Sequence, residues 1–155
     1  MIPAPDKEKM LSRLMRLCAT RECCESDLRK KLAVLPDAEA EDVLETLRRE
    51  GFVDVARYAR AFARDKSALQ GWGSLKIKLA LQRKAIDAHA IDAALEEIDA
   101  ESARRKCEQV LRLKWDSLRG ETDPVRRQAR FFRYALGRGY GYEEIKRIYD
   151  HLRRD

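Results

Sequence analysis

A pattern of basic and apolar residues that returns about every 47 positions is the feature that most constrains the fold of this chain. The segment 28–32 (LRKKL) recurs as 75–79 (LKIKL), and a looser copy, 129–133 (ARFFR), follows 54 positions later. Each copy is followed by a second apolar pair: Val43 and Leu47, Ile91 and Leu95, and Ile145 and Tyr149. Self-similarity with a period of roughly 20–50 residues is typical of modules that bury their apolar faces on one another. The sequence therefore predicts tandem modules, an architecture that favours binding over catalysis.

The composition favours helices over sheets. The chain has 155 residues, of which 45% are hydrophobic and 39% charged, with seven glycines and four prolines. This is enough apolar material for a core and too much for a disordered chain. Strong helix formers predominate, and few runs combine β-branched residues with strict alternation. We therefore predict an all-α fold.

Apolar residues at helical spacing predict nine helices. We expect them at about 6–18, 25–34, 38–50, 55–69, 74–84, 88–98, 100–118, 125–136 and 142–152. Four helix starts carry a residue type that caps an N-terminus well, namely Asp37, Asp54, Asp87 and either Thr122 or Asp123. Pro124 then occupies a first helical position, where a missing N–H group costs nothing.

The segment 74–84 is open to two interpretations. Leu75, Ile77, Leu79 and Leu81 alternate with two lysines and an alanine, which is the pattern of a strand. A lone strand would have no neighbour to pair its backbone groups, so we predict a helix. Such a helix would place Leu75 and Leu79 on one face and Ile77 and Leu81 on another. It would then pack on two sides as the middle helix of its module.

The nine helices divide into three modules of three, with boundaries at 1–53, 54–99 and 100–155. The last module holds 15 Lys and Arg against 9 Asp and Glu, while the whole chain has a formal net charge of +6. This excess indicates an anionic partner, either nucleic acid or an acidic protein surface. The alternative is a basic helical surface that only keeps the protein in solution.

Basic residues recur on the middle helix of every module. In the last module, Arg126, Arg130 and Arg133 follow one helical stripe, a geometry suited to pairing with phosphates or carboxylates. The predicted contact surface consists of Arg29, Lys30, Lys31, Lys76, Lys78, Arg83, Lys84, Arg126, Arg127, Arg130 and Arg133. If the modules stack with a regular rotation, these residues would line one continuous face. The aromatic residues in 131–140 could stack on bases, although packing in the core is the favoured alternative.

The sequence holds no motif for catalysis, for a cofactor or for a metal. It has no phosphate-binding glycine loop, nucleophile elbow or paired zinc-ligand spacing. His89 and His151 are expected at the surface. The four cysteines, Cys18, Cys23, Cys24 and Cys107, are expected to be structural thiols. No apolar stretch approaches the roughly 18 residues of a membrane span, and the start lacks a signal peptide, so we expect a soluble, cytoplasmic protein.

Four segments together resemble the RecX family, regulators of the RecA recombinase. The most specific is 50–59 (EGFVDVARYA), where a glycine, an aromatic, an aliphatic and an aspartate precede Arg-aromatic-Ala. Segments 21–32, 71–79 and 84–86 match further family motifs, and the resemblance extends over 10–152. Three departures are local: Val55 replaces a frequent aspartate, Cys24 replaces an N-capping serine and Ala85 replaces a C-capping glycine. Because thiols cap poorly and alanine disfavours a left-handed turn, the last two put local geometry in question.

The resemblance implies an elongated, curved array of three three-helix repeats that binds RecA filaments on DNA. There it would suppress ATP hydrolysis, strand exchange and filament growth, and so regulate DNA repair and recombination. It implies no enzymatic activity and no cofactor. We expect a monomer that contacts single- or double-stranded DNA weakly or through the filament. The alternative is a stand-alone DNA-binding protein that uses the stripe at 126–133 on phosphates. The sequence leaves open the sign of the regulation and which repeat contacts recombinase or DNA.

Overall fold

The computed structural model describes residues 6–155, and this part of the chain is helical without a strand. Its α-helices are α1 (Lys7–Thr20), α2 (Glu25–Lys31), α3 (Asp37–Arg49), α4 (Val55–Ala68), α5 (Ser74–Arg83), α6 (Ala88–Glu96), α7 (Ala100–Ser117), α8 (Pro124–Gly137) and α9 (Tyr142–Leu152). A short 3₁₀ helix, η1 (Leu32–Val34), continues α2. The all-α prediction is confirmed, including the choice of a helix over a strand for 74–84.

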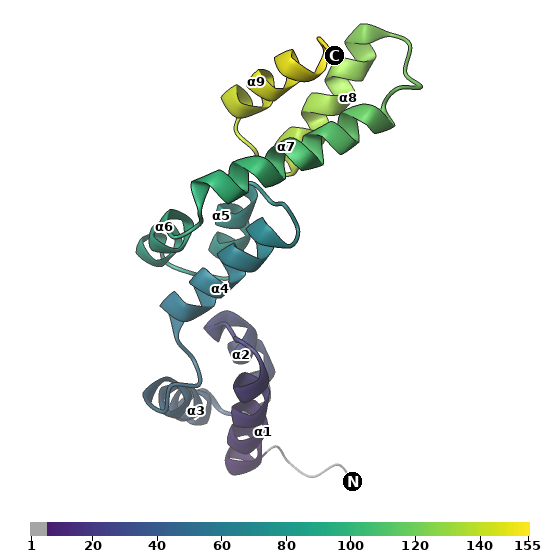
Figure 1. Cartoon of the computed structure of the whole chain (residues 1–155). Coiled ribbons are helices and arrows are strands. Elements are labelled where there is room, and N and C mark those ends of the chain that lie inside the picture. The colour runs from purple at the N-terminus through teal and green to yellow at the C-terminus, as the bar shows by residue number, and fades with distance from the viewer. Residues whose placement is uncertain (1–5) are drawn as a thin grey trace.

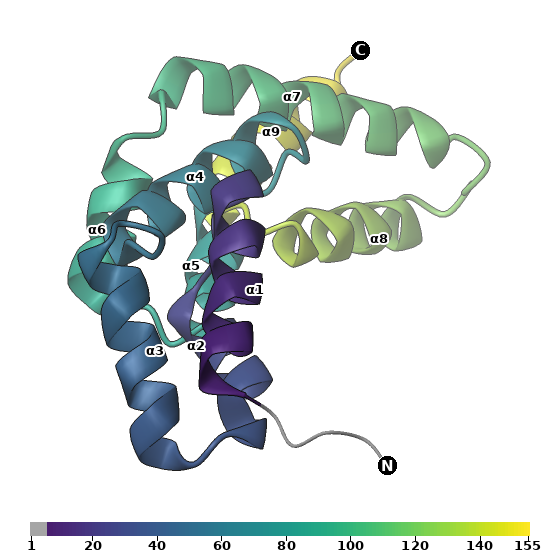
Figure 2. The ribbon, with the colours of Figure 1, turned by 90° about the horizontal axis from the view of Figure 1, so that it is seen from below.

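The helices form three groups that follow one another along an elongated, curved array (Figures 1 and 2). We call them repeat 1 (α1–α3), repeat 2 (α4–α6) and repeat 3 (α7–α9). Repeats 1 and 3 occupy the two ends of the array, with repeat 2 between them (Figure 1). None of the helices within 6–155 is both long enough and apolar enough to cross a membrane.

Each repeat buries its own apolar cluster, because each helix supplies one apolar stripe and no single helix can cover it. Large side chains that are almost fully buried in the three clusters include Leu14, Leu44 and Leu47, then Ile77, Leu81 and Ile91, and finally Leu111, Phe131 and Ile145. Cys24 crosses this division, since it belongs to repeat 1 by sequence but packs in the cluster of repeat 2. The clusters thus give three small cores joined end to end.

Most helix starts follow the capping residues that the sequence offers. The carboxylates of Asp54, Asp87 and Asp123 each accept a hydrogen bond from an N–H group in the first turn that follows. Asp123, rather than Thr122, is therefore the cap of α8. Cys24 stands at the N-cap of α2 without a capping hydrogen bond from its side chain, as expected for a thiol.

The start of α3 and the end of α2 differ from the prediction. Pro36 occupies the N-cap of α3, and Asp37 is the first helical residue instead of the cap. Pro36 has no side-chain acceptor, while Asp37 places a negative charge in the first turn, where the helix dipole favours it. The α-helical part of α2 ends at Lys31, because the proline disfavours a helical conformation at Leu35 and the chain tightens into η1 first.

Helix α5 buries only one of its two apolar faces. Ile77 and Leu81 are 0% exposed, whereas Leu75 and Leu79 are each 53% exposed. The prediction that α5 packs on two sides is therefore wrong. Helices α4 and α6 cover the face that carries Ile77 and Leu81. Repeat 3 reaches only the first turn of α5, where the Leu75 N–H donates to the carbonyl of Gly139 at 3.2 Å.

Repeats 2 and 3 are joined through the backbone as well as through α4 and α7, which pack together. The Gly73 N–H donates to the carbonyl of Arg138 at 2.7 Å, and the Tyr140 hydroxyl donates to the carbonyl of Gly71. A Cβ atom at Gly73 would lie 2.3 Å from the backbone of Gly139. Two glycine-containing turns therefore cross at van der Waals contact and fix repeat 3 on repeat 2.

Repeats 1 and 2 are joined mainly by polar side chains. The Ser26 hydroxyl donates to the carbonyl of Lys84 at 2.9 Å, and Lys84 Nζ pairs with Asp27 at 2.9 Å. The guanidinium of Arg57 donates to Glu22 at 2.7 Å. The hydrogen bond with Asp27 raises the pKa of Lys84, and the same bond lowers the pKa of Asp27.

Candidate functional site

The predicted basic surface of repeat 1 lies on α2. Arg29 pairs with Glu25 at 2.9 Å and also with Glu41, so its charge is balanced within the repeat. Lys30 and Lys31 are exposed and have no ion pair within 4 Å among the described residues. Two of the three predicted contact residues of repeat 1, Lys30 and Lys31, are therefore without an internal ion pair in the described part of the chain.

The four predicted cations at α5 also include some that interact within the protein and some that are exposed without an ion pair. Lys84 forms an ion pair with Asp27 of repeat 1. Lys76 is half-buried, and its ammonium lies 4.3 Å from the centre of the Trp72 ring. Lys78 and Arg83 are exposed, without an ion pair in the described part of the chain. They are the cations that α5 presents to solvent.

On α8, Arg127 has a structural role. Its guanidinium lies 3.5 Å from the centre of the Trp115 ring and donates to the carbonyl of the same residue at 3.0 Å. Arg126 and Arg130 pair loosely with carboxylates, each at 3.8 Å, and are mostly exposed. Arg133 is exposed without an ion pair among residues 6–155.

Helices α2, α5 and α8 follow one another along the array (Figure 1). Five of their cations are exposed without an internal ion pair in the described part: Lys30, Lys31, Lys78, Arg83 and Arg133. Their alignment into one continuous face stays a prediction. The aromatic residues beside them are mostly in the core: Phe131 is 0% exposed and Tyr140 is 5% exposed.

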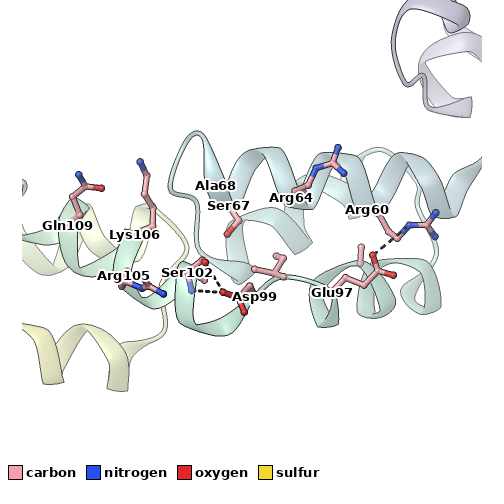
Figure 3. Close-up of a pocket in the computed structure, with 13 residues that line it drawn as sticks. Arg60, Arg64, Ser67, Ala68, Glu97, Asp99, Ser102, Arg105, Lys106 and Gln109 are labelled. Carbon is pink, nitrogen blue, oxygen red and sulfur yellow. Dashed lines mark hydrogen bonds and ion pairs between the residues drawn. The ribbon is translucent and has the colours of Figure 1, made fainter.

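A groove of about 900 Å³ lies where α4 meets α6 and α7, and sequence reasoning missed it (Figure 3). Its lining consists of Arg60, Arg64, Ser67, Ala68, Ala94, Glu97, Ile98, Asp99, Ser102, Ala103, Arg105, Lys106 and Gln109. It extends from Arg60 and Glu97 at one end to Lys106 and Gln109 at the other (Figure 3). We call it the α4–α7 groove.

Cations outnumber carboxylates along the α4–α7 groove by four to two. Both carboxylates are engaged. Glu97 pairs with Arg60 at 3.6 Å, and Asp99 caps α7 by accepting from the Ser102 N–H at 2.9 Å and from its hydroxyl at 2.7 Å. These hydrogen bonds lower the pKa of Asp99. The lining residues therefore carry an excess of positive charge at neutral pH, and both lining carboxylates already have partners.

One signal in the sequence could have indicated the groove. Arg60 and Arg64 are four residues apart, and the run 104–106 (RRK) lies just after the first turn of the long helix of the last module. Each alone is typical of a solvated helix face. Only the packing of α4 on α7 brings the two together across a hollow.

The cysteines lie in the apolar clusters, and all four are free and buried. Burial raises the pKa of Cys18 to about 12 and also raises the pKa of Cys107. Within the described residues, no three His, Cys, Asp or Glu side chains gather where they could hold a metal ion.

Known proteins resemble this chain over nearly its whole length. A family model of the second three-helix domain of RecX matches residues 56–95. Regulatory protein RecX of Yersinia enterocolitica is 30% identical, over 91% of this chain and 96% of its own. Regulatory protein RecX of Escherichia coli strain SE11 is also 30% identical, over 94% of this chain and 92% of its own.

Solved structures agree with this relationship. A crystal structure of regulatory protein RecX superposes with a TM-score of 0.82 at 25% identity, over 93% of this chain and 73% of that one. RecX from Lactobacillus salivarius superposes with a TM-score of 0.79 over 96% of this chain and 97% of its own, and at 17% identity it shows the fold alone. With the sequence relationship and the three-repeat array in agreement, the chain belongs to the RecX family of regulatory proteins.

Proposed function

We propose that this protein binds the RecA recombinase filament on DNA and inhibits its ATP hydrolysis, strand exchange and extension. The observation that carries the proposal is the relationship to regulatory RecX proteins over more than nine-tenths of both chains. Through this action the protein would regulate DNA repair and recombination. It would act by occupying a surface, as a monomer and without catalysis.

The array supplies the physical support. Its three repeats form an elongated array (Figure 1), and repeat proteins bind large partners on such extended surfaces. The middle helices of all three repeats carry exposed cations that have no ion pair in the described part of the chain, namely Lys30, Lys31, Lys78, Arg83 and Arg133. A filament that carries DNA offers phosphates along its length, and such cations would add electrostatic attraction to protein contacts.

The alternative is a stand-alone DNA-binding protein. The exposed Arg126, Arg130 and Arg133 on α8 favour it, because repeat 3 holds the excess positive charge of the chain. On this alternative, the protein would compete with the recombinase for DNA and would need no contact with it.

The deciding experiment is a titration of DNA-dependent ATP hydrolysis by the RecA of the same organism, with DNA binding measured in parallel without RecA. Filament regulation predicts inhibition at protein concentrations that leave free DNA unbound. Inhibition only at concentrations that saturate the DNA would overturn the proposal in favour of the DNA-binding alternative. That alternative also predicts that log K falls with log salt by about 0.7–0.9 for each phosphate contacted.

A charge-neutralising variant tests the basic surface. Lys30→Gln, Lys78→Gln and Arg133→Gln combined should raise the concentration needed for half inhibition about tenfold, since each exposed ion pair contributes about 0.2–1 kcal/mol. The control removes three exposed cations elsewhere, with Arg13→Gln, Arg16→Gln and Lys146→Gln. Equal weakening by both variants would mean that net charge alone matters.

A further inference from the structure

We propose that the α4–α7 groove binds a short acidic peptide segment of a partner protein, with apolar side chains of that segment on the groove floor. Two helices line the groove with side chains at helical spacing. Arg60, Arg64 and Ala68 lie at i, i+4 and i+8 on α4, and Ser102, Lys106 and Gln109 lie at i, i+4 and i+7 on α7. Residues at this spacing share one helix face. The α4 stripe lines one end of the groove and the α7 stripe lines the other, so the two stripes follow one another along its length (Figure 3).

Each stripe is long enough for a segment of two to three helical turns. The eight steps from Arg60 to Ala68 on α4 and the seven steps from Ser102 to Gln109 on α7 each advance about 10–12 Å at 1.5 Å per residue. A volume of about 900 Å³ is at the upper end of the range for small-molecule pockets. A helix laid in a groove between helices is a common mode of peptide recognition, in which apolar anchors recur every three or four residues.

The floor is apolar. Ala94 is 1% exposed, and Ile98 and Ala103 beside it are half-buried. Small alanines here leave room for incoming side chains, and covering this surface would remove apolar area from water at roughly 25 cal/mol per Å².

The lining is cationic, and its cations can exchange partners. Arg64 and Arg105 are over 70% exposed and meet carboxylates of their own helices at 3.5 and 3.7 Å. Exposed pairs of this kind contribute little. Lys106 has no ion pair among the residues that the structure describes. Asp or Glu side chains of a bound segment would therefore find cationic donors at both ends of the groove.

The same lining disfavours a nucleic acid strand. Single strands are held by aromatic side chains on which bases stack, and none of the groove-lining residues is aromatic. A phosphate backbone would also leave the apolar floor unused. The occupant that matches both the floor and the cationic lining is an acidic amphipathic peptide.

Direct binding tests this inference without recombinase, so it can succeed or fail independently of the proposed function. The probe is a fluorescein-labelled 12-residue peptide with leucines at helical spacing and Asp or Glu elsewhere, followed by anisotropy against the whole protein. A peptide with Asn and Gln in place of Asp and Glu, and a 12-nucleotide single strand, are measured beside it. The acidic peptide should bind at least tenfold more tightly than both.

Two groove variants locate the binding. Arg64→Gln with Lys106→Gln should weaken peptide binding about tenfold, by loss of two exposed charge contacts. Ala68→Trp should weaken it by filling the groove while leaving the charge unchanged. The control Arg13→Gln with Arg16→Gln removes the same charge from α1 and should have little effect, and circular dichroism verifies that all three variants are folded.

Each contrary outcome overturns the proposal. Tighter binding of the oligonucleotide, with the same loss in the groove variants, would make the groove a nucleic-acid site. Equal weakening by the groove and control variants would mean that the peptide follows net charge. Absence of peptide binding at millimolar concentration would remove the groove as a peptide site.

Discussion

Ala85 ends α5 in a backbone conformation that alanine disfavours. Its φ is +61°, the one positive value at a non-glycine residue in the described part of the chain. The Ile86 N–H donates to the carbonyl of Leu81, and the Ala85 N–H donates to that of Gln82, which together form a Schellman motif. This motif favours glycine at the position of Ala85, so the turn forms with alanine at a cost in folding free energy.

We expect Ala85→Gly to raise the free energy of unfolding by about 1 kcal/mol. The left-handed conformation costs an L-residue roughly 1–2 kcal/mol, and glycine avoids this cost. Part of the gain is offset because glycine has more conformational freedom to lose when the chain folds. Urea denaturation measures the change. As a matched control, Ala93→Gly in the middle of α6 should lower stability by about 1 kcal/mol. A loss of stability in both variants would show that the turn at Ala85 carries no strain.

Glu25 makes the stability of repeat 1 depend on pH. Arg48 donates hydrogen bonds to its carboxylate, and Arg29 adds another, so the pKa of Glu25 lies below its usual range. The unfolded chain then binds more protons at acid pH, and the stabilisation is complete above the unfolded pKa of about 4.3. It is lost as the pH falls through the folded value.

Glu25→Gln should therefore cost about 1 kcal/mol at pH 7, with allowance for the part of Arg48 that solvent screens, and progressively less as the pH falls towards 3. Urea denaturation at pH 7, 5, 4 and 3 provides the comparison. Glu45→Gln removes a mostly exposed partner of the same arginine and should change little at any pH. An equal loss for Glu25→Gln at pH 3 and pH 7 would exclude an electrostatic origin.

At the scale of elements, the turn before α5 and the turn after α8 depend on having no side chains where they cross. Gly73 has an ordinary φ of −78°, so its requirement is steric, and an added Cβ would lie 2.3 Å from the Gly139 backbone. We expect Gly73→Ala to cost about 2–4 kcal/mol, because backbone atoms cannot yield as a flexible side chain can.

Thermal unfolding of Gly73→Ala checks this expectation, and Gly137→Ala is its control. A Cβ at Gly137, the last residue of α8, would meet nothing within 4 Å, so alanine there should be neutral or slightly stabilising. If Gly73→Ala unfolds at the wild-type temperature, the crossing does not hold repeats 2 and 3 together.

Periodicity predicted every helix except 74–84, because each carries one apolar stripe that its repeat must bury. In 74–84 the alternation favoured a strand, and the lack of a neighbouring strand decided for a helix. Periodicity failed for Leu75 and Leu79, since an apolar pair on a helix does not reveal whether a neighbour will cover it. It also failed for Asp37, because a proline can take the N-cap position without a capping side chain.

The candidate site could be predicted only in part from the sequence. The sequence shows the basic residues of the middle helices, but it does not show which of them interact within the protein. The contact of Arg127 with Trp115 and the ion pair of Lys84 with Asp27 depend on packing between elements. The α4–α7 groove is a property of two helices from different repeats. No local pattern encodes such a hollow.

At the scale of the whole molecule, the two joints of the array differ in kind. Repeat 3 is fixed on repeat 2 by backbone contacts at Gly73 and Gly139 and by the buried Tyr140. Repeat 1 is held by the buried Cys24 and by polar side chains, chiefly Arg57 and Lys84. In a linear array each interface contributes separately to stability, so repeat 1 should loosen first.

Arg57 is the central residue of the first joint. Its guanidinium donates to Glu22, to the carbonyl of Gly51 at 3.1 Å and to that of Phe52 at 3.4 Å. It therefore links α4 both to repeat 1 and to the connector between α3 and α4, residues 51–54. Arg57→Ala should speed amide hydrogen exchange in α1–α3 and in 51–54, and leave α7–α9 unchanged.

Arg64→Ala is the matched control, two turns along the same helix, where the side chain is 73% exposed and meets only Asp65 at 3.5 Å. Exchange in repeat 1 should match the wild type in this variant. Faster exchange across all three repeats in Arg57→Ala would mean that the array unfolds as one cooperative unit. Faster exchange confined to repeat 1 and the connector would establish it as the segment whose orientation can adapt, while repeats 2 and 3 stay rigid.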